Sequence, residues 1–189
     1  MELRAIFAGF GGQGIVLMGT LLAQAGMKHG RHVTFYPSYG AAMRGGTANC
    51  SVIVAEEPIA SPIIASPNVL VVMNDPSLDV FLSRLAAGGT LLFNSALIQR
   101  RVGRADVAIH AVPANTIAEQ LGDGRMANMA MLGALIRATA ILPLPVVEAA
   151  LVETFGRKGP TVVERNTQAL RQGYGLPQLD SPSPMHSSS

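Results

Sequence analysis

An apolar run, a cluster of glycines and a helical pattern follow one another at the start of the chain, and this order constrains the fold more than any other feature. Residues 3–8 are typical of a buried strand and residues 15–28 of a helix. Gly9, Gly11 and Gly14 lie between them in the pattern G-x-G-x-x-G. A strand followed by a glycine-rich turn and a helix is the first unit of many α/β folds with a largely parallel sheet. We therefore expect an α/β fold.

The same glycine pattern occurs in proteins that bind NAD, but these need a further acidic residue. That residue lies roughly 20 positions beyond the glycines, at the end of the second strand, and holds the ribose hydroxyls. Here the second strand is predicted at residues 32–36, and no Asp or Glu occurs between Glu2 and Glu56. Arg44, which could serve NADP, lies in a separate loop. A stand-alone NAD(P)-binding protein is thus an alternative, for which the sequence offers no acidic residue to bind the ribose.

A second glycine-rich segment, residues 37–50 ("PSYGAAMRGGTANC"), follows the second predicted strand. It is too long for a tight hairpin turn and is predicted to be a functional loop. Backbone amides at a helix start attract anions, and Arg44 beside two glycines could bind a phosphate. The two loops are expected to meet, because the carboxyl ends of neighbouring strands face one crevice. The candidate cofactor-binding residues are Gly11, Gly12, Gln13, Gly14, Ser38, Tyr39, Gly40, Arg44, Gly45, Gly46, Thr47 and Asn49.

The glycines also have a purely structural explanation. They permit tight turns and close packing of a helix on a strand without any ligand. Both explanations are kept at this point.

The rest of the chain alternates strands with helices and then becomes helical. Strands are predicted at 51–55, 69–73, 90–95 and 107–112, and helices at 126–142, 145–155 and 161–175. The proline-rich segment 56–67 favours an edge or a crossover over a central strand. This order predicts a three-layer α/β/α sandwich with a Rossmann-like, mostly parallel or mixed sheet and a helical C-terminal third. We expect one domain, residues 1–176, and a disordered Pro/Ser-rich tail, residues 177–189.

Helix boundaries are predicted from capping residues. Asp75 is predicted to cap a helix with Pro76 in its first turn, and this helix is predicted to end at the glycines of 88–89. The segments 116–119 and 161–164 both have the Thr-x-x-Glu spacing of a capping box.

The composition narrows the class of protein. Hydrophobic residues make up 49% and charged residues 14% of the chain, where about a quarter charged is usual. A sheet buried on both faces and burial against partner subunits both account for this, and the two are compatible. The formal charge is +2, with no dense basic block, which argues against nucleic-acid or lipid partners. No secretory segment or membrane span is apparent, so a cytoplasmic location is expected.

The sequence shows no pattern of residues typical of a catalytic or metal-binding site. The single cysteine, Cys50, cannot form an internal disulfide or supply the thiolate set of a zinc site or an iron–sulfur cluster. It lies in an apolar strand pattern that predicts a buried, inert thiol. No serine has a plausible base and orienting acid, and no metal-ligand spacing is found among His29, His32, His110 and His186. No catalytic residue and no metal site are assigned to this chain.

Three stretches together resemble a known family. "GFGGQGIVLMGTLLAQAG", "YPSYGAAMRGGTANCSVIVAEEPIASP" and "NMAMLGALIRAT" closely resemble the gamma subunit of 2-oxoacid:ferredoxin oxidoreductases, and the likeness runs from about residue 3 to about residue 174. It places the family's two glycine-rich motifs on residues 11–14 and 38–49. One departure is Ala42, where the family commonly has an acidic residue. This chain therefore lacks a carboxylate at this position that could pair with Arg44 or contact a partner.

The resemblance implies an accessory subunit of a complex that oxidatively decarboxylates a 2-oxoacid to the acyl-CoA and reduces ferredoxin. It places thiamine diphosphate and iron–sulfur clusters mainly in partner chains, with no cofactor assigned to this chain alone. The implied partners are alpha and beta subunits, with a ferredoxin-like delta subunit as a further candidate. Among the acids, the second motif looks most like the 2-oxoglutarate branch, followed by pyruvate and branched-chain acids.

The isolated chain is expected to be inactive. A vacant partner surface could let it form a homodimer. A ligand-free structural homo-oligomer is a third alternative, because the composition is apolar.

Overall fold

The fold is seen in a computed structural model that describes residues 1–38 and 47–177. Its six-stranded sheet has the order β2-β3-β1-β4-β5-β6. The strands are β1 (Glu2–Phe10), β2 (His32–Ser38), β3 (Thr47–Ala55), β4 (Val69–Val72), β5 (Thr90–Asn94) and β6 (Ala108–Val112). The α-helices are α1 (Ile15–Lys28), α2 (Asp75–Phe81), α3 (Ala114–Gln120), α4 (Ala127–Thr139), α5 (Leu144–Phe155) and α6 (Pro160–Tyr174), with short 3-10 turns η2 (Leu82–Arg84), η3 (Gly124–Met126) and η4 (Gly156–Lys158).

The sheet is mixed, which is one of the two predicted forms. β1, β4, β5 and β6 run parallel, whereas β3 is antiparallel to both of its neighbours, β1 and β2. β3 is the next described element after β2 and pairs with it in the antiparallel direction. The predicted crossover at 56–67 is confirmed, because this segment leads from β3 past β1 to β4.

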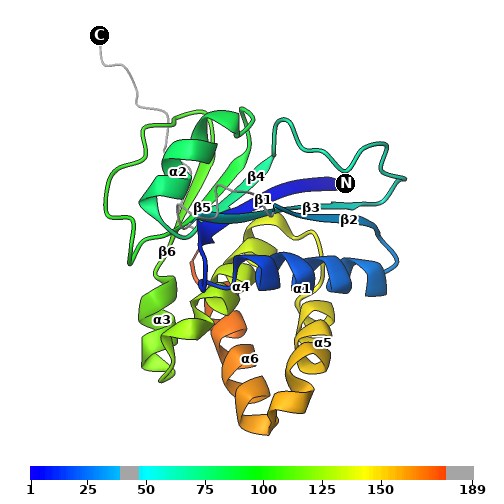
Figure 1. The fold of residues 1–189 in the computed structure, drawn as a ribbon, viewed down its shortest axis with the longest axis vertical. Coiled ribbons are helices and arrows are strands. Elements are labelled where there is room, and N and C mark those ends of the chain that lie inside the picture. The colour runs from blue at the N-terminus through cyan, green and yellow to red at the C-terminus, as the bar shows by residue number, and fades with distance from the viewer. Residues whose placement is uncertain (39–46, 178–189) are drawn as a thin grey trace.

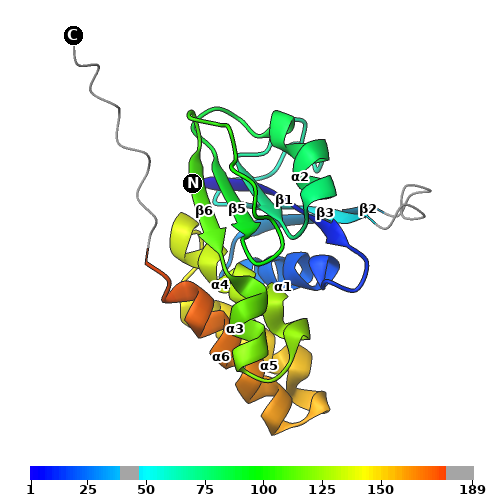
Figure 2. The same cartoon turned by 90° about the vertical axis from the view of Figure 1, so that its left-hand side faces the viewer.

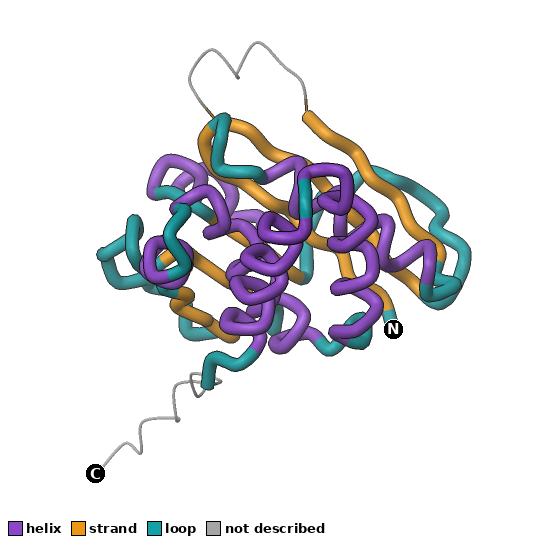
Figure 3. Tube along the Cα trace, turned by 90° about the horizontal axis from the view of Figure 1, so that it is seen from below, coloured by secondary structure: helices purple, strands orange, loops and turns teal. Residues whose placement is uncertain are grey.

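The predicted three-layer sandwich is confirmed, and its layers are unequal. α1, α3 and α4 lie on one face of the sheet, and the pair α5 and α6 projects further from it (Figures 1 and 2). Seen from that side, the helices gather in front of the strands (Figure 3). The opposite face is covered by α2 and by loops (Figure 2). The helical C-terminal third therefore thickens one layer only.

Strand β1 contributes to both layers, which explains why its sequence is apolar from Ala5 to Ala8. Leu3, Ala5 and Phe7 are buried in the cluster on the helix-rich face, and Ile6 and Ala8 in the cluster beneath α2. Side chains of a strand alternate between the two faces, so a strand covered on both sides is apolar at every position. The low charge content follows in part from this double burial.

Helix α1 approaches β2 and β3 closely through two glycines. A Cβ added at Gly19 would lie 2.6 Å from the Sγ of Cys50, and one added at Gly26 would lie 2.8 Å from Val33. These glycines are seven residues apart and so lie on the same side of the helix. They confirm close helix-to-strand packing as one role of glycine in this chain.

Three predicted helix caps are wrong. The side chain of Asn74, not Asp75, accepts a hydrogen bond from the backbone N–H of Ser77 and caps α2. Helices α3 and α6 begin at Ala114 and Pro160, with no side-chain cap, so the capping-box threonines lie inside the helices. The prolines that precede or begin these helices start them before the threonines are reached.

The helix after β4 is shorter than predicted. α2 ends at Phe81 and η2 at Arg84, before Gly88 and Gly89. Gly88 has φ 73° and Gly89 approaches the carbonyl oxygens of Ala86 and Asn68, so the pair forms the turn into β5 instead. Within residues 1–38 and 47–177, no helix is long and apolar enough to cross a membrane.

The predicted functional loop is also shorter than expected. Pro37 and Ser38 belong to β2, and Thr47 to Cys50 belong to β3. Ser38 is therefore a residue of β2, and Thr47 and Asn49 are residues of β3, which pairs with β1 along its whole length. The tail beyond Pro177 lies outside the described residues.

Candidate functional site

The first glycine-rich motif and the two ends of the second lie at one edge of the sheet. Phe10, which precedes the first motif, is paired with Thr47, and Ser38 is paired with Asn49. Both ends of the second motif therefore lie at the carboxyl end of β1, as the sequence predicts. The remaining candidates of this motif lie outside the described residues; they are Tyr39, Gly40, Arg44, Gly45 and Gly46, together with Ala42.

The first motif forms a tight turn that only glycine accommodates at two positions. Gly12 and Gly14 have φ values of 88° and 73°, a region that other residues rarely adopt. Gly14 is the residue that precedes the first turn of α1, and no side chain caps that turn. Gly11 and Gly12 have open space around them. The 14-residue helix thus begins with no acidic residue in its first turn.

Gln13 serves the fold with one end of its side chain. Its Oε1 accepts hydrogen bonds from the backbone N–H of Phe10 at 2.6 Å and from the Nδ2 of Asn74 at 3.3 Å. Gln13 was predicted to bind a ligand through its side-chain amide. Only the Nε2 end remains for that role, because the oxygen links the glycine turn to Asn74 after β4.

The structure shows buried amide side chains at this edge of the sheet that the sequence prediction did not include. Asn74 and Asn94 end or follow the buried strands β4 and β5, and Asn128 on α4 lies against Gly14. Asn94 Nδ2 donates to the Oδ1 of Asn115 at 2.7 Å. The signal was present in the sequence, because a lone polar residue at the carboxyl end of an apolar strand favours a site at that edge.

A groove of about 470 Å³ extends from the glycine turn along the helices. Its size falls within the range typical of ligand sites. Apolar side chains and cationic side chains both line it, and Lys158 lies over the ring of Phe155 at 5.4 Å. The lining residues are Gly12, Gly14, Leu17, Asp123, Arg125, Met126, Asn128, Phe155, Lys158, Thr161, Val162, Arg165 and Asn166.

The charge balance of the groove is positive. The groove is lined by three cationic side chains, Arg125, Lys158 and Arg165, and by one carboxylate, Asp123. Hydrogen bonds from the Arg125 side chain hold the pKa of Asp123 down at about 2, so this carboxylate is ionised at neutral pH. The pair with Arg125 cancels one positive charge, and Lys158 and Arg165 leave the groove suited to an anion.

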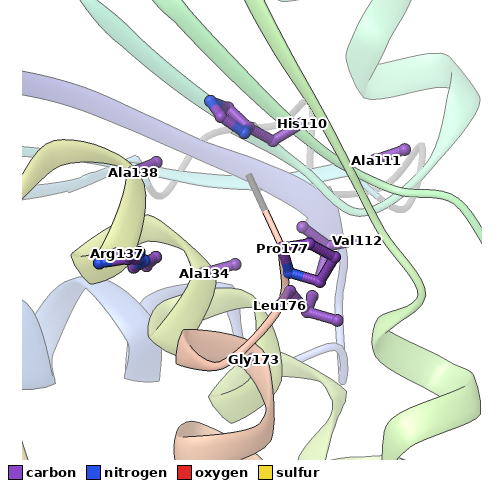
Figure 4. A pocket seen from close by; sticks show the side chains of 9 residues that line it. All are labelled: His110, Ala111, Val112, Ala134, Arg137, Ala138, Gly173, Leu176 and Pro177. Atoms are coloured by element: carbon purple, nitrogen blue, oxygen red, sulfur yellow. The ribbon is translucent and has the colours of Figure 1, made fainter. Parts of the chain in front are cut away.

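A second hollow, at the β6 edge, is much smaller. It has a volume of about 20 Å³, which is room for one water molecule. His110 of β6, Arg137 of α4 and Pro177 are among the residues that line it (Figure 4). Burial lowers the pKa of His110 below its ordinary value, so the imidazole is neutral at pH 7. The hollow is too small for a substrate.

Cys50 is buried in β3, as predicted. Its Sγ donates to the backbone oxygen of Ile15 at 3.5 Å. Burial raises the pKa of the thiol from 9.0 to about 12. The predicted burial is confirmed, and a protonated thiol without solvent access is a poor nucleophile. Among the described residues, no three His, Cys, Asp or Glu side chains lie close enough to hold a metal ion.

The raised pKa of Cys50 predicts a loss of stability at alkaline pH. The unfolded chain releases this proton above pH 9.0, whereas the folded chain retains it up to about pH 12. The contribution of the thiol is therefore complete below pH 9 and falls above it by about 1.4 kcal/mol per pH unit until pH 12. Denaturant unfolding at pH 8, 9 and 10 measures the slope. An equal slope in Cys50→Ala would contradict this cause.

Comparison with known proteins identifies the family. The chain matches the family described as pyruvate ferredoxin/flavodoxin oxidoreductase over residues 4–176. The chain therefore belongs to the pyruvate ferredoxin/flavodoxin oxidoreductase family.

Two curated relatives differ in length from one another. The ketoisovalerate oxidoreductase subunit VorA of Methanothermobacter thermautotrophicus is 44% identical over 135 residues, which is 71% of this chain and 28% of VorA. The 2-oxoglutarate synthase subunit KorC of Methanothermobacter marburgensis is 34% identical over 176 residues, covering 89% of this chain and 93% of KorC. The chain thus spans just over a quarter of VorA but nearly all of KorC.

A solved structure has the same fold. The gamma subunit of a keto/oxoacid ferredoxin oxidoreductase from Geobacter sulfurreducens superposes with a TM-score of 0.78 at 26% identity. The superposition covers 91% of this chain and 96% of that subunit. These findings support the predicted likeness to gamma subunits and lend no support to the nicotinamide-binding or ligand-free alternatives.

Proposed function

We propose that this chain is the gamma-type subunit of a complex that oxidatively decarboxylates a 2-oxoacid to the acyl-CoA and passes the electrons to ferredoxin. The observation that carries the proposal is the family match over residues 4–176, together with a likeness that covers 93% of KorC. Acting alone, the chain has no activity in this proposal. Its part is to complete the catalytic complex.

The donor groups of the chain support a division of labour between subunits. Iron–sulfur clusters are held by several cysteine thiolates. This chain has one cysteine, buried and protonated in β3, so its residues do not fit a cluster. The clusters and thiamine diphosphate are assigned to partner subunits. When bound there, thiamine diphosphate would supply an electron sink for the decarboxylation of the 2-oxoacid.

The length of VorA supports the same division. Because this chain corresponds to 28% of VorA, the remaining length of VorA has no counterpart here. In the proposed complex, separate alpha and beta subunits correspond to the remaining length of VorA. The surface proposed to face a partner or a cofactor in that complex is the edge of the sheet where the first glycine motif and the two ends of the second lie.

The substrate is proposed to be 2-oxoglutarate, in line with the second glycine motif and with the nearly full-length match to KorC. A branched-chain 2-oxoacid is the second candidate, because the identity to the ketoisovalerate subunit VorA is higher over the aligned part. Side chains of the thiamine-bearing subunit are expected to decide between them.

Purification from the native host tests the proposal. The tagged chain is isolated without oxygen, its companions are identified, and dye reduction is assayed with coenzyme A and each of 2-oxoglutarate, pyruvate and 2-oxoisovalerate. We expect thiamine- and cluster-bearing chains to copurify and one acid to dominate. A chain that emerges alone and inactive after gentle isolation would argue against the complex.

Replacement of Arg44 tests the second motif. In the assembled complex, Arg44→Ala is expected to lower turnover about tenfold, the effect of one charge-assisted hydrogen bond. Arg101→Ala, which removes an exposed arginine from the loop before β6, is the matched control and should leave turnover unchanged. Equal activity of the Arg44 variant and the native complex would favour a purely structural role of the glycine loop.

A further inference from the structure

One side of the sheet ends in an unprotected edge strand, β2. It pairs with β3 on one side, and the sheet order places no strand of the described chain on the other. Helix α1 lies beneath β2 and β3 (Figure 1). An edge of this kind presents backbone N–H and C=O groups to which a further strand can pair.

Proteins usually protect such an edge with charged side chains, prolines or a covering segment. β2 contains no Asp, Glu, Lys or Arg, and its one proline, Pro37, lies next to the end of the strand. The opposite edge strand, β6, is two residues shorter, and Leu176 and Pro177 line the hollow beside it. Of the two edges, β2 is therefore the longer and the less protected.

The outward direction of the β2 backbone follows from the neighbouring ladder. The N–H of Glu56 donates to the oxygen of Met1 at 3.3 Å, in register with the pairing of β3 and β1. Because the direction of the backbone groups alternates along a strand, even-numbered residues of β3 bond to β1 and odd-numbered residues bond to β2. Odd-numbered residues of β3 face even-numbered residues of β2. The backbone groups of Val33, Phe35 and Pro37 therefore face away from the sheet.

Apolar surface remains uncovered on both faces of β2. Val33 and Phe35 pack toward α1, where each is only partly buried. Thr34 and Tyr36 lie on the opposite face, and Tyr36 is 62% exposed. A strand added to this edge would cover both sets of side chains.

We infer that a second copy of this chain binds here through its own β2, antiparallel, with a two-fold axis at Phe35. Phe35 is the middle residue of β2, so this axis lets all seven residues face the second copy. The pairing joins two six-stranded sheets into one continuous sheet. Because the contact is between identical surfaces, it closes at two copies. This inference goes beyond the proposed function and does not depend on it.

Backbone and side chains match in this register. Phe35 faces Phe35 of the second copy, and the two residues can exchange hydrogen bonds in both directions. Val33 donates to the oxygen of Pro37, so the missing N–H of proline falls at the ends of the ladder and not at its centre. On the other face, Thr34 lies opposite Tyr36. These are uncharged pairs of aromatic, β-branched and proline residues, and no like charges oppose one another.

The mass of the 189-residue chain in solution tests the pairing. We expect a concentration-dependent dimer, of twice the 19.7 kDa mass of one chain, in analytical ultracentrifugation. Thr34→Lys combined with Tyr36→Lys places like charges opposite one another and should weaken the dimer at least about tenfold. Thr34→Glu combined with Tyr36→Glu should do the same. An equimolar mixture of the two double variants should form the dimer again, because each lysine then faces a glutamate, which misfolded chains could not reproduce.

Cross-linking tests the register. Cys50 is buried, so an introduced cysteine is the exposed one. Thr34→Cys mixed with Tyr36→Cys places two cysteines directly opposite, with Cα atoms about 4.5 Å apart, which suits a disulfide. Either variant alone places its cysteines diagonally, about 7–8 Å apart, so only the mixture should cross-link efficiently. Gln168→Cys, at an exposed position of α6, is the matched control and should not cross-link with Tyr36→Cys.

Four results would overturn the pairing. A native chain that stays monomeric up to about 1 mM lacks this interface. Lysine variants that dimerise like the native chain place the contact elsewhere, and equal cross-linking of Tyr36→Cys alone and of the mixture excludes the axis at Phe35. A monomeric chain whose lysine variant no longer copurifies with its companions would assign the edge to a strand of a partner subunit. A failure to find 2-oxoacid oxidation affects none of these measurements, so the two proposals can fail separately.

Discussion

Gly173→Ala is expected to destabilise the chain by at least about 3 kcal/mol, the upper part of the range for overpacked cores. Gly173 of α6 faces α4 so closely that an added Cβ would lie 1.8 Å from the backbone oxygen of Ala130. The contact is reciprocal, because a Cβ on Gly133 of α4 would lie 1.9 Å from the backbone oxygen of Leu170. The neighbouring atoms are helix backbone, so a side-chain rotation cannot relieve the overlap and the helices must separate.

Thermal and urea unfolding measure this effect. For a chain of this length, a loss of 3 kcal/mol corresponds to a fall in Tm of roughly 6–12 °C. Gly156→Ala is the matched control, because Gly156 has a helical φ of −55° and no atom within 4 Å of an added Cβ. We expect this control to be neutral or slightly stabilised. Equal stability of the Gly173 and Gly156 variants would show that α4 and α6 do not pack as described.

Gly14→Ala is expected to have the second largest effect, about 2–4 kcal/mol, from two additive causes. An alanine at φ 73° is strained, and its Cβ would lie 2.1 Å from the Nδ2 of Asn128. Asn128 is 3% exposed and has little room to move. The substitution should therefore weaken both the start of α1 and its packing on α4.

A double-mutant comparison separates the two causes. Combining Gly14→Ala with Asn128→Ala removes the overlap but leaves the strained φ. The double variant should thus lose less stability than the sum of the single variants, as measured by urea unfolding. Gly30→Ala, at φ 73° with open space around it, supplies the strain alone. Strict additivity of the Gly14 and Asn128 losses would mean that the side chains do not meet.

Local sequence patterns predicted most of the elements. Residues 15–28 were predicted as a helix, and α1 has those bounds. The central strands were recognisable because both of their faces are buried, which makes them apolar without interruption. The predicted ends of helices and strands were wrong where a tertiary contact outweighed the local sequence pattern. Asn74 caps α2 in place of Asp75, and β3 continues to Thr47 because its partner β1 extends to Phe10.

The candidate site was predictable in part. The glycines at 11–14 mark a turn by themselves, since their spacing between a strand and a helix allows few other structures. Asn115 and Arg125 could not be assigned, because they are about 100 residues away in sequence and reach Gln13 only through the sheet order. The binding roles proposed for the second motif, Arg44 included, remain predictions.

The sequence by itself determined the α/β class, the strand–glycine–helix start and the membership suggested by the glycine motifs. These features are local, because periodic burial and backbone conformation depend on a few consecutive residues. Only the tertiary structure decided which polar groups face one another. The amide networks of Gln13 and Asn115 and the close crossing of α4 and α6 arise from segments far apart in the chain. Their partners are set by the packing of the whole sheet, which no single segment specifies.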